Sequence, residues 1–239
     1  MDPSSVKKSL IVFGVCAAAI VLGIILVMQS RRTQPAAIET EGSLFILPTP
    51  VHDSETSVEK ALLERRSLRE YGREPLTLAE ISQLLWAAQG ITHPAGLRTA
   101  PSAGALYPLE IYLLAGNVTD LRAGIYHYKP ESHALSLIAE GDQRPALRQA
   151  ALGQSAVQDA AAVIVIAAIY ERTTVKYGER GVSYVHMEVG SVAQNIYLQA
   201  VSLNLGTVFI GAFHDDEVKK VLHITGDEQP LGLMPVGRK

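Results

Sequence analysis

Hydrophobic positions form one long run at the amino end of the chain and shorter segments after it. From Ser9 to Ser30 there is no charged residue, a span of 22 positions. About 20 apolar residues cross a bilayer core as a helix, so residues 1–30 are predicted to be an N-terminal transmembrane helix that anchors the chain. A cleaved signal peptide is the alternative, although its apolar region is usually shorter, about 7 to 15 residues.

The charges that flank this run bear on orientation. Lys7 and Lys8 precede it, and Arg31 and Arg32 follow it. The amino terminus adds a little to the first side, which weakly favours an amino end in the cytoplasm and a domain outside. We therefore expect a single-pass membrane location with both sides open for the domain.

Residues 31–54 are predicted to be a linker, because prolines interrupt them among Thr, Ser and Glu. The apolar patch at 44–47 (LFIL) either docks on the domain or remains part of a spacer. A single domain is expected over residues 55–239, a normal size for one folding unit.

Helical and strand signals alternate along this domain. Thr77 and Glu80 form a capping box before an apolar segment, and Gly90 can end that helix. Residues 161–170 (AAVIVIAAIY) are continuously apolar, which suits a strand buried on both faces. Further strands are expected at 109–115, 124–128, 135–139, 207–213 and 231–236, and further helices at 58–70, 144–152 and 182–205. Several strands follow one another by short turns, so the class is α+β with a mixed or antiparallel sheet flanked by helices.

The helix expected at 58–70 carries arginines in unusual places. A helical projection puts Arg65 and Arg69 within the apolar stripe and Arg66 on its border. A buried unpaired charge is costly, so these groups need an anionic partner. An internal carboxylate or a bound phosphate would serve, since the guanidinium group binds both through paired N–H donors. Composition alone favours the carboxylate.

The helix expected at 182–205 has apolar residues at three- and four-residue steps, and Glu188 is its one formal charge. A helix this poor in charge is usually buried on most sides. Either it is the central core helix of a monomer or a second subunit covers it, and we favour the interface.

Composition excludes several functions. The formal charge is −3, from 21 basic and 24 acidic residues, which argues against nucleic acid as a partner. Cys16 is the one cysteine, so the domain has no disulfide, cysteine zinc site or thiol nucleophile. The seven histidines are scattered, so no metal site is predicted. GSVA (190–193) lacks the second glycine of a nucleophile elbow, and no phosphate-binding glycine motif is present.

Five ordered segments resemble the nitroreductase superfamily of FMN enzymes, and in particular its branch of SagB-type peptide dehydrogenases, which oxidise azolines to azoles. These segments are ERRSLREY (64–71), APSAGALYP (100–108), KYGERG (176–181) followed by EVG (188–190) and AQN (193–195), LGT (205–207) followed by IG (210–211), and MPVGR (234–238).

The resemblance implies an intertwined homodimer with FMN at the subunit interface. It implies that Arg65, Arg66 and Ser67 hold the phosphate and ribityl chain, with Arg238 adding charge near the phosphate. A phosphate thereby becomes the preferred partner of the arginines. The remaining implied FMN contacts are Ser102 and Gly104 from the other subunit, and the backbone N–H groups of Ile210 and Gly211 near the flavin N5 and O4 edge.

The resemblance also bears on chemistry. It implies an FMN-dependent oxidoreductase that passes hydride or electrons from a donor such as NAD(P)H to a small organic acceptor. Lys176 and Tyr177 are similar to the lysine–tyrosine pair of azoline dehydrogenases, so oxidation of azolines or peptides is one alternative. An exposed charge on a loop is the other interpretation of Lys176. A non-catalytic flavin-binding module at a membrane is a further alternative.

Overall fold

The computed structural model of the chain describes residues 39–40 and 44–239. The predicted transmembrane segment, residues 1–30, lies outside this described part. Within the described part, no helix is both long and apolar enough to cross a bilayer.

One sheet of eight strands forms the centre of the described domain, and every neighbouring pair in it is antiparallel. Its strands, in spatial order, are β1 (Glu39–Thr40), β2 (Leu44–Ile46), β7 (Ala134–Glu140), β6 (Gly124–Lys129), β4 (Leu109–Ala115), β8 (Ala162–Ala168), β10 (Gln229–Arg238) and β9 (Leu205–Thr207). A separate parallel pair joins β3 (Leu76–Thr77) to β5 (Val118–Thr119). The prediction of an α+β fold with antiparallel pairing is confirmed.

Strand β8 is the middle of the core. All seven of its residues are buried, and β4 and β10 pair with it on either side. A continuous apolar run suits this position because both faces of the strand are covered. The predicted strand at 161–170 is therefore confirmed, a little shorter than expected.

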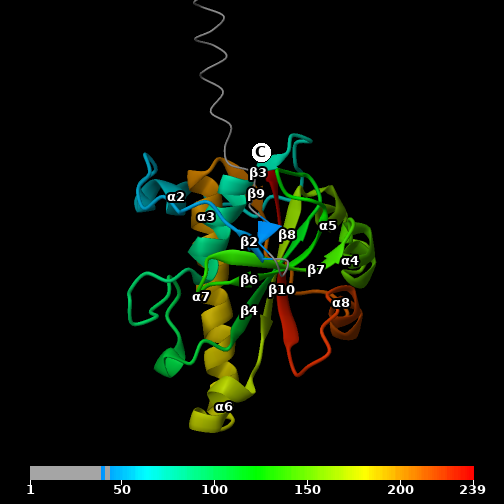
Figure 1. Cartoon of the computed structure of the whole chain (residues 1–239). Coiled ribbons are helices and arrows are strands. Elements are labelled where there is room, and N and C mark those ends of the chain that lie inside the picture. Colours follow the sequence, from blue (N-terminus) through cyan, green and yellow to red (C-terminus); the bar gives the residue numbers. More distant parts are fainter. Residues whose placement is uncertain (1–38, 41–43) are drawn as a thin grey trace, which may run out of the picture. The chain divides into compact units, whose positions relative to one another are not determined.

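Helices cover both faces of the sheet (Figure 1). The helices are α2 (Val58–Glu64), α3 (Leu78–Gln89), η1 (Ala103–Ala105), α4 (Arg144–Ala150), α5 (Ser155–Asp159), α6 (Glu171–Tyr177), α7 (Arg180–Ser202) and α8 (Asp215–Val221). Helices α3 and α7 share one hydrophobic cluster with the sheet, whereas α4, α5 and α8 share a second cluster. The capping box of Thr77 and Glu80 is present at the start of α3, as predicted.

Two predicted elements are wrong in extent. Helix α2 ends at Glu64 instead of residue 70, because Arg65 leaves the helical conformation with ψ 123° and its N–H closes the last turn on Ala61. The following residues run alongside β9 and β10, so bonds to distant strands replace helical ones. Of the strand expected at 207–213, only Thr207 belongs to a strand, as the last residue of β9. Beyond it, Ile210 makes a single bridge to Leu233.

Part of the range expected to be a linker packs on the domain. Strand β2 pairs with β7, and Phe45 and Leu47 are buried. The side-chain amide of Gln83 then holds Val51, with Val51 N–H donating to Oε1 at 2.8 Å and Nε2 donating to the Val51 carbonyl at 2.9 Å. Of the two alternatives for residues 44–47, the docked one describes this segment.

Candidate functional site

Tyr197 of α7 joins three segments that are far apart in the sequence. Its hydroxyl lies 2.9 Å from Oγ of Ser67 and accepts the backbone N–H of Phe209 at 2.7 Å. The guanidinium carbon of Arg65 lies 5.1 Å from the centroid of its ring, within the range of a cation–π contact. One buried side chain thus links the predicted phosphate-binding residues to the segment before Ile210 and Gly211.

The backbone after α2 explains how these residues reach α7. Leu68 N–H donates to the Thr207 carbonyl at 2.9 Å, and Gly72 N–H donates to the Arg238 carbonyl at 3.0 Å. Residues 67–72 therefore lie along β9 and the end of β10, which places Ser67 beside Thr207.

The arginines are more exposed than a helical projection predicts. Arg65 is half-buried, whereas Arg66 and Arg69 are exposed. The expectation that Arg65 and Arg69 lie in a buried helical stripe is therefore wrong, because α2 ends before them. Within residues 39–40 and 44–239, no carboxylate pairs with any of these three arginines. Arg66 instead donates to the carbonyl groups of Leu63 and Arg65, so the internal-carboxylate alternative does not hold within that range.

Arg238 differs from these three arginines in its hydrogen-bond partners. Its guanidinium group binds the Glu80 carboxylate through two N–H···O contacts of 2.5 and 2.8 Å, and it also donates to the Pro75 carbonyl at 2.9 Å. Glu80 is also the capping-box residue of α3. The charge expected near a phosphate is thus paired with a carboxylate in this structure.

A pocket of 480 Å³ opens along α7 next to Tyr197. Its lining residues are His186, Val189, Gly190, Ala193, Gln194, Tyr197, Phe209 and Leu231. Phe209 directly precedes Ile210 and Gly211 in the sequence, but neither of these two predicted residues is among those that line the pocket. The wall is mainly apolar with a few polar groups, which is typical of sites for small organic ligands.

The two predicted backbone donors, Ile210 and Gly211, differ in their hydrogen bonding. Ile210 N–H donates to the Leu233 carbonyl at 2.8 Å, and Leu233 N–H returns a bond of 2.9 Å. Ile210 N–H is therefore occupied and cannot face a flavin, contrary to expectation. Gly211 is exposed, and a donor role for its N–H stays a prediction.

A second group of predicted residues gathers at Gly104. A Cβ built on Gly104 would lie 2.8 Å from the Tyr177 hydroxyl and 3.0 Å from Nζ of Lys176. Both side chains come from the last turn of α6, not from a loop. The geometry therefore brings Lys176 and Tyr177 together over the loop that contains Ser102 and Gly104.

This loop has an unusual backbone. Gly104, Ala105 and Tyr107 have φ values of 64°, 53° and 46°. Positive φ is uncommon for residues other than glycine, and such strain often marks functional segments. The Ser102 hydroxyl accepts Tyr107 N–H at 2.9 Å, which holds the turn closed.

Glu188 lies beneath the same loop and is 3% exposed. Burial raises the pKa of its carboxyl group, while hydrogen bonds from Ser102 and Gln89 and the charge of Arg98 act in the opposite direction. The Ser102 hydroxyl is therefore engaged by Glu188 and by Tyr107 inside its own chain.

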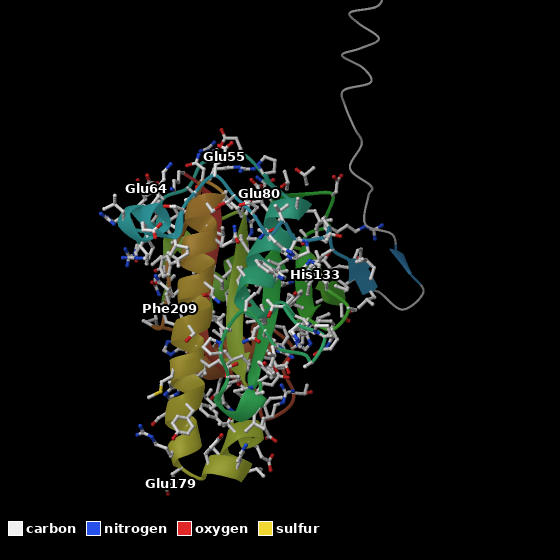
Figure 2. The ribbon with its side chains drawn as sticks, turned by 90° about the vertical axis from the view of Figure 1, so that its left-hand side faces the viewer. Glu55, Glu64, Glu80, His133, Glu179 and Phe209 are labelled. Carbon is white, nitrogen blue, oxygen red and sulfur yellow. The ribbon has the colours of Figure 1, made fainter. Side chains whose placement is uncertain are left out.

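The two groups lie at opposite ends of α7. Figure 2 shows Glu64, which precedes the arginines, near one end of this helix and Glu179, which follows the Lys176–Tyr177 pair, at the other. Arg180 and Tyr197 are 17 positions apart on the helix, or about 25 Å at the rise of 1.5 Å per residue. Ser102, Gly104, Lys176 and Tyr177 are not among the residues that line the pocket beside Tyr197.

None of the eight residues that line the pocket is among the predicted site residues. Tyr197 and His186 lie on α7, where spacing indicates only a helix with a buried face, and Phe209 lies in a segment predicted to be a strand. Only Tyr197 had a signal that sequence reasoning could have used, because a polar hydroxyl on a buried helical face requires a partner. A larger cavity of 680 Å³, between residues 51–58 and helices α3 and α7, contains none of the predicted site residues.

Comparisons with known proteins agree with this geometry. The model of the "Nitroreductase family" matches residues 62–238. Over 185 residues the chain is 52% identical to MJ1384 of Methanocaldococcus jannaschii, a protein named as a nitroreductase, covering 77% of this chain and 92% of that one.

Two solved structures are also similar. A nitroreductase-named protein from Ralstonia eutropha has a TM-score of 0.72 and 29% identity, covering 85% of this chain and 92% of that one. A chain of the Escherichia coli microcin synthetase McbBCD complex, solved with truncated pro-microcin B17 bound, has a TM-score of 0.64 and 26% identity, with 92% of each chain covered. With the α+β fold described above, these matches establish that the chain belongs to the nitroreductase family.

Proposed function

We propose that the chain is an FMN-dependent oxidoreductase that carries hydride or electrons from a donor such as NAD(P)H to a small organic acceptor. The observation that supports this most is the Tyr197 junction, which connects Arg65, an arginine without a carboxylate partner in the described part, to a mainly apolar pocket. A ligand with an anionic end and a flat apolar ring fits such a junction.

The phosphate end of the cofactor fits Arg65, Arg66 and Ser67. Guanidinium groups bind phosphate through paired N–H donors, and the N–H groups of Arg65 face no acidic side chain within the described residues. Thr207 lies beside Ser67 and is 2% exposed, and its Oγ1 has no hydrogen-bond partner in the described part. Buried hydroxyl groups are normally paired, so a polar ligand or water at this position fits the chain.

The ring end fits the pocket beside Tyr197 and Phe209. When FMN is bound, it supplies the two-electron chemistry, and the protein binds, orients and tunes it. The Gly211 N–H, two positions after the pocket residue Phe209, would serve as a backbone donor that favours the negative charge of a reduced flavin.

A homodimer completes this proposal. No residue of the loop of Ser102 and Gly104 lines the pocket within the described chain, so in this proposal the loop reaches the pocket from a second chain. Exposed apolar side chains on α2 and α7 support the same arrangement, among them Leu62, Leu63 and Met187, which are 53%, 73% and 58% exposed. Association would remove them from water.

The test of the proposal is flavin content. The purified chain should carry FMN and be yellow, and Arg65→Ala should lower FMN affinity about tenfold or more, since a hydrogen bond to a charged group contributes about 1.5–3 kcal/mol. Arg122→Ala is the matched control, because Arg122 is exposed and its ion pair with Glu140 spans 3.7 Å. Full FMN occupancy in Arg65→Ala would contradict the phosphate assignment. FMN binding without turnover of any donor and acceptor would favour the non-catalytic module.

A second candidate function is oxidation of azolines or peptides. It is favoured by the convergence of Lys176 and Tyr177 on Gly104 and by the likeness to a chain of the peptide-bound microcin synthetase complex. In that reaction the Lys176 amine would take a proton from an azoline carbon, and bound FMN would supply the two-electron oxidation that accepts the accompanying hydride, so that the azole forms. A lysine acts as a base only when its pKa lies near the working pH.

Lys176→Ala separates the two functions. The oxidoreductase proposal expects NAD(P)H-dependent reduction to survive in this variant, whereas azoline oxidation would be lost. If wild type oxidises no azoline-containing peptide, the second function fails.

Attachment to a membrane through residues 1–30 remains a proposal. Its support is the 22-residue uncharged span from Ser9 to Ser30. Sedimentation with membranes that resists carbonate extraction would support it, and protease access to the domain in intact cells would assign the side.

A further inference from the structure

The pocket beside Tyr197 contains one side chain whose chemistry the proposed function does not use. His186 lines the pocket from α7. The Tyr197 hydroxyl is committed to Ser67 and Phe209, and Gln194 does not titrate. Among the described residues that line this pocket, His186 is thus the remaining side chain whose ring nitrogens can both donate and accept a proton.

His186 is held in a fixed orientation. Its Nε2 lies 2.6 Å from the Tyr170 hydroxyl, and the two rings meet edge to face, with centroids 5.7 Å apart and planes at 84°. Tyr170 lies between β8 and α6, so the helix of the pocket is tied to the end of the central strand. A short hydrogen bond and a ring contact together restrict rotation of the imidazole.

The surroundings favour proton transfer by the imidazole over transfer by the phenol. Burial raises the pKa of Tyr170, and the negative charge of Asp215 at the start of α8 raises it further. The phenol therefore keeps its proton at neutral pH. Two acidic residues lie near the Tyr170–His186 pair. Asp215 acts on Tyr170, and Glu188, on the same helix as His186, accepts a hydrogen bond from Gln89 of α3. His186 is itself exposed on one side and can regain a proton from water.

We infer that His186 is a catalytic acid for acceptor reduction in this pocket and that Tyr170 is its positioning residue, an inference that rests on the proposed oxidoreductase function. The acceptor class is a quinone or another carbonyl-type oxidant whose reduction consumes a proton. Reduction of a quinone to a hydroquinone takes one hydride and one proton. NAD(P)H would be the source of the hydride, and bound FMN would supply the two-electron chemistry. The imidazolium N–H gives its proton to the quinone oxygen, which forms the O–H bond and leaves a neutral imidazole.

The first experiment compares two acceptors in His186→Gln. Benzoquinone requires the proton, whereas ferricyanide takes electrons only. General acid catalysis typically contributes about 10²–10⁴-fold, so kcat with benzoquinone should fall about 100-fold while kcat with ferricyanide stays within about twofold. Added imidazole should restore part of the benzoquinone rate. Equal losses with both acceptors, or no loss with either, would overturn the inference.

The second experiment does not depend on turnover. In the flavin-free protein, the ¹⁵N resonances of the His186 ring report its tautomer, and Tyr170→Phe should change the tautomer ratio. Addition of FMN should shift the His186 signals and leave those of His93, an exposed histidine in the 91–98 loop, unchanged. His93→Gln is the matched control for kinetics.

The outcomes separate this inference from the proposed function. If FMN leaves the His186 signals unmoved while the protein remains yellow and active, the role of His186 is overturned and the oxidoreductase proposal stands. If wild type reduces neither acceptor, the oxidoreductase proposal fails and the role of His186 fails with it.

Discussion

The hydroxyl of Tyr197 lies 2.9 Å from Oγ of Ser67, although the two residues are 130 positions apart. The same hydroxyl accepts the N–H of Phe209. A change at this one oxygen therefore affects both ends of the candidate site.

Tyr197→Phe removes that oxygen and little else. The Phe209 N–H loses its acceptor, and an unsatisfied buried donor costs about 1–3 kcal/mol. We expect a lower unfolding temperature together with weaker FMN binding, measured by thermal unfolding and by flavin titration. Tyr184→Phe serves as the control, because within the described residues the Tyr184 hydroxyl makes no recorded hydrogen bond and its ring contacts Tyr177 and Arg180. Equal behaviour of the two variants would contradict the role of Tyr197.

Gly104→Ala tests the loop under Lys176 and Tyr177. A positive φ costs an alanine roughly 1–2 kcal/mol of stability. The control is Gly96→Ala: Gly96 has φ 80°, and a Cβ built on it meets no atom within 4 Å, so this variant should lose the same stability without a new contact. The added methyl at Gly104 meets the movable ends of two side chains, so both variants should lose similar stability. Turnover should fall only in Gly104→Ala. Equal turnover in the two variants would show that the convergence of these side chains does not matter for the reaction.

Glu80→Gln tests Arg238. Glutamine preserves the capping box at the start of α3, while the carboxylate that neutralises Arg238 is removed. If Arg238 contributes charge to a nearby phosphate, FMN affinity should rise several-fold, at a stability cost of up to about 1 kcal/mol for the partly exposed ion pair. Isothermal titration with FMN measures this. An unchanged affinity would assign Arg238 to a purely structural link between β10 and α3.

His133 makes stability depend on pH. Its ring bonds to Ser82 at 2.7 Å and to Tyr128 at 2.9 Å, and burial lowers its pKa below the ordinary value of 6.5. As pH falls, the unfolded chain takes up the proton first, so stability present above about 6.5 is lost as pH falls through the lower pKa of the folded state.

The comparison for His133 is His133→Asn, because asparagine tolerates the φ of 46° at this position. Wild type should lose more unfolding temperature than the variant between pH 7.5 and 5. Glu188, whose raised pKa acts in the opposite direction, is present in both proteins and cancels. Parallel pH profiles would contradict the prediction.

Local chemistry explains which elements the sequence predicts well. The capping box at Thr77 and Glu80 is complete within four residues, and the buried run of β8 is continuous, so neither needs information from elsewhere. Helix α2 is mispredicted because its end depends on the pairing of residues 67–72 with β9 and β10. Ile210 is mispredicted for the same reason, because Leu233 occupies its N–H.

The candidate site is predicted in its parts but not in its connections. Arg65, Ser67 and Gly211 could be identified by resemblance, and the structure places Arg65 and Ser67 against Tyr197, which is one of the residues that line the pocket. Tyr197 was missed because a tyrosine at a buried helical position usually indicates core packing. The partners of its hydroxyl, Ser67 and Phe209, belong to other segments of the chain. His186 was missed because its partner Tyr170 belongs to another element.

The 102–104 loop does not line the pocket beside Tyr197 within the described chain, and this has a genetic consequence. If two chains build each site jointly, a chain defective at Arg65 and a chain defective in the 102–104 loop should complement each other when co-expressed. Their mixed dimers would contain one intact site and one doubly damaged site, so activity should return towards half of that of an undamaged pair. A chain with both lesions would restore nothing and would act as a dominant inhibitor by capturing wild-type subunits.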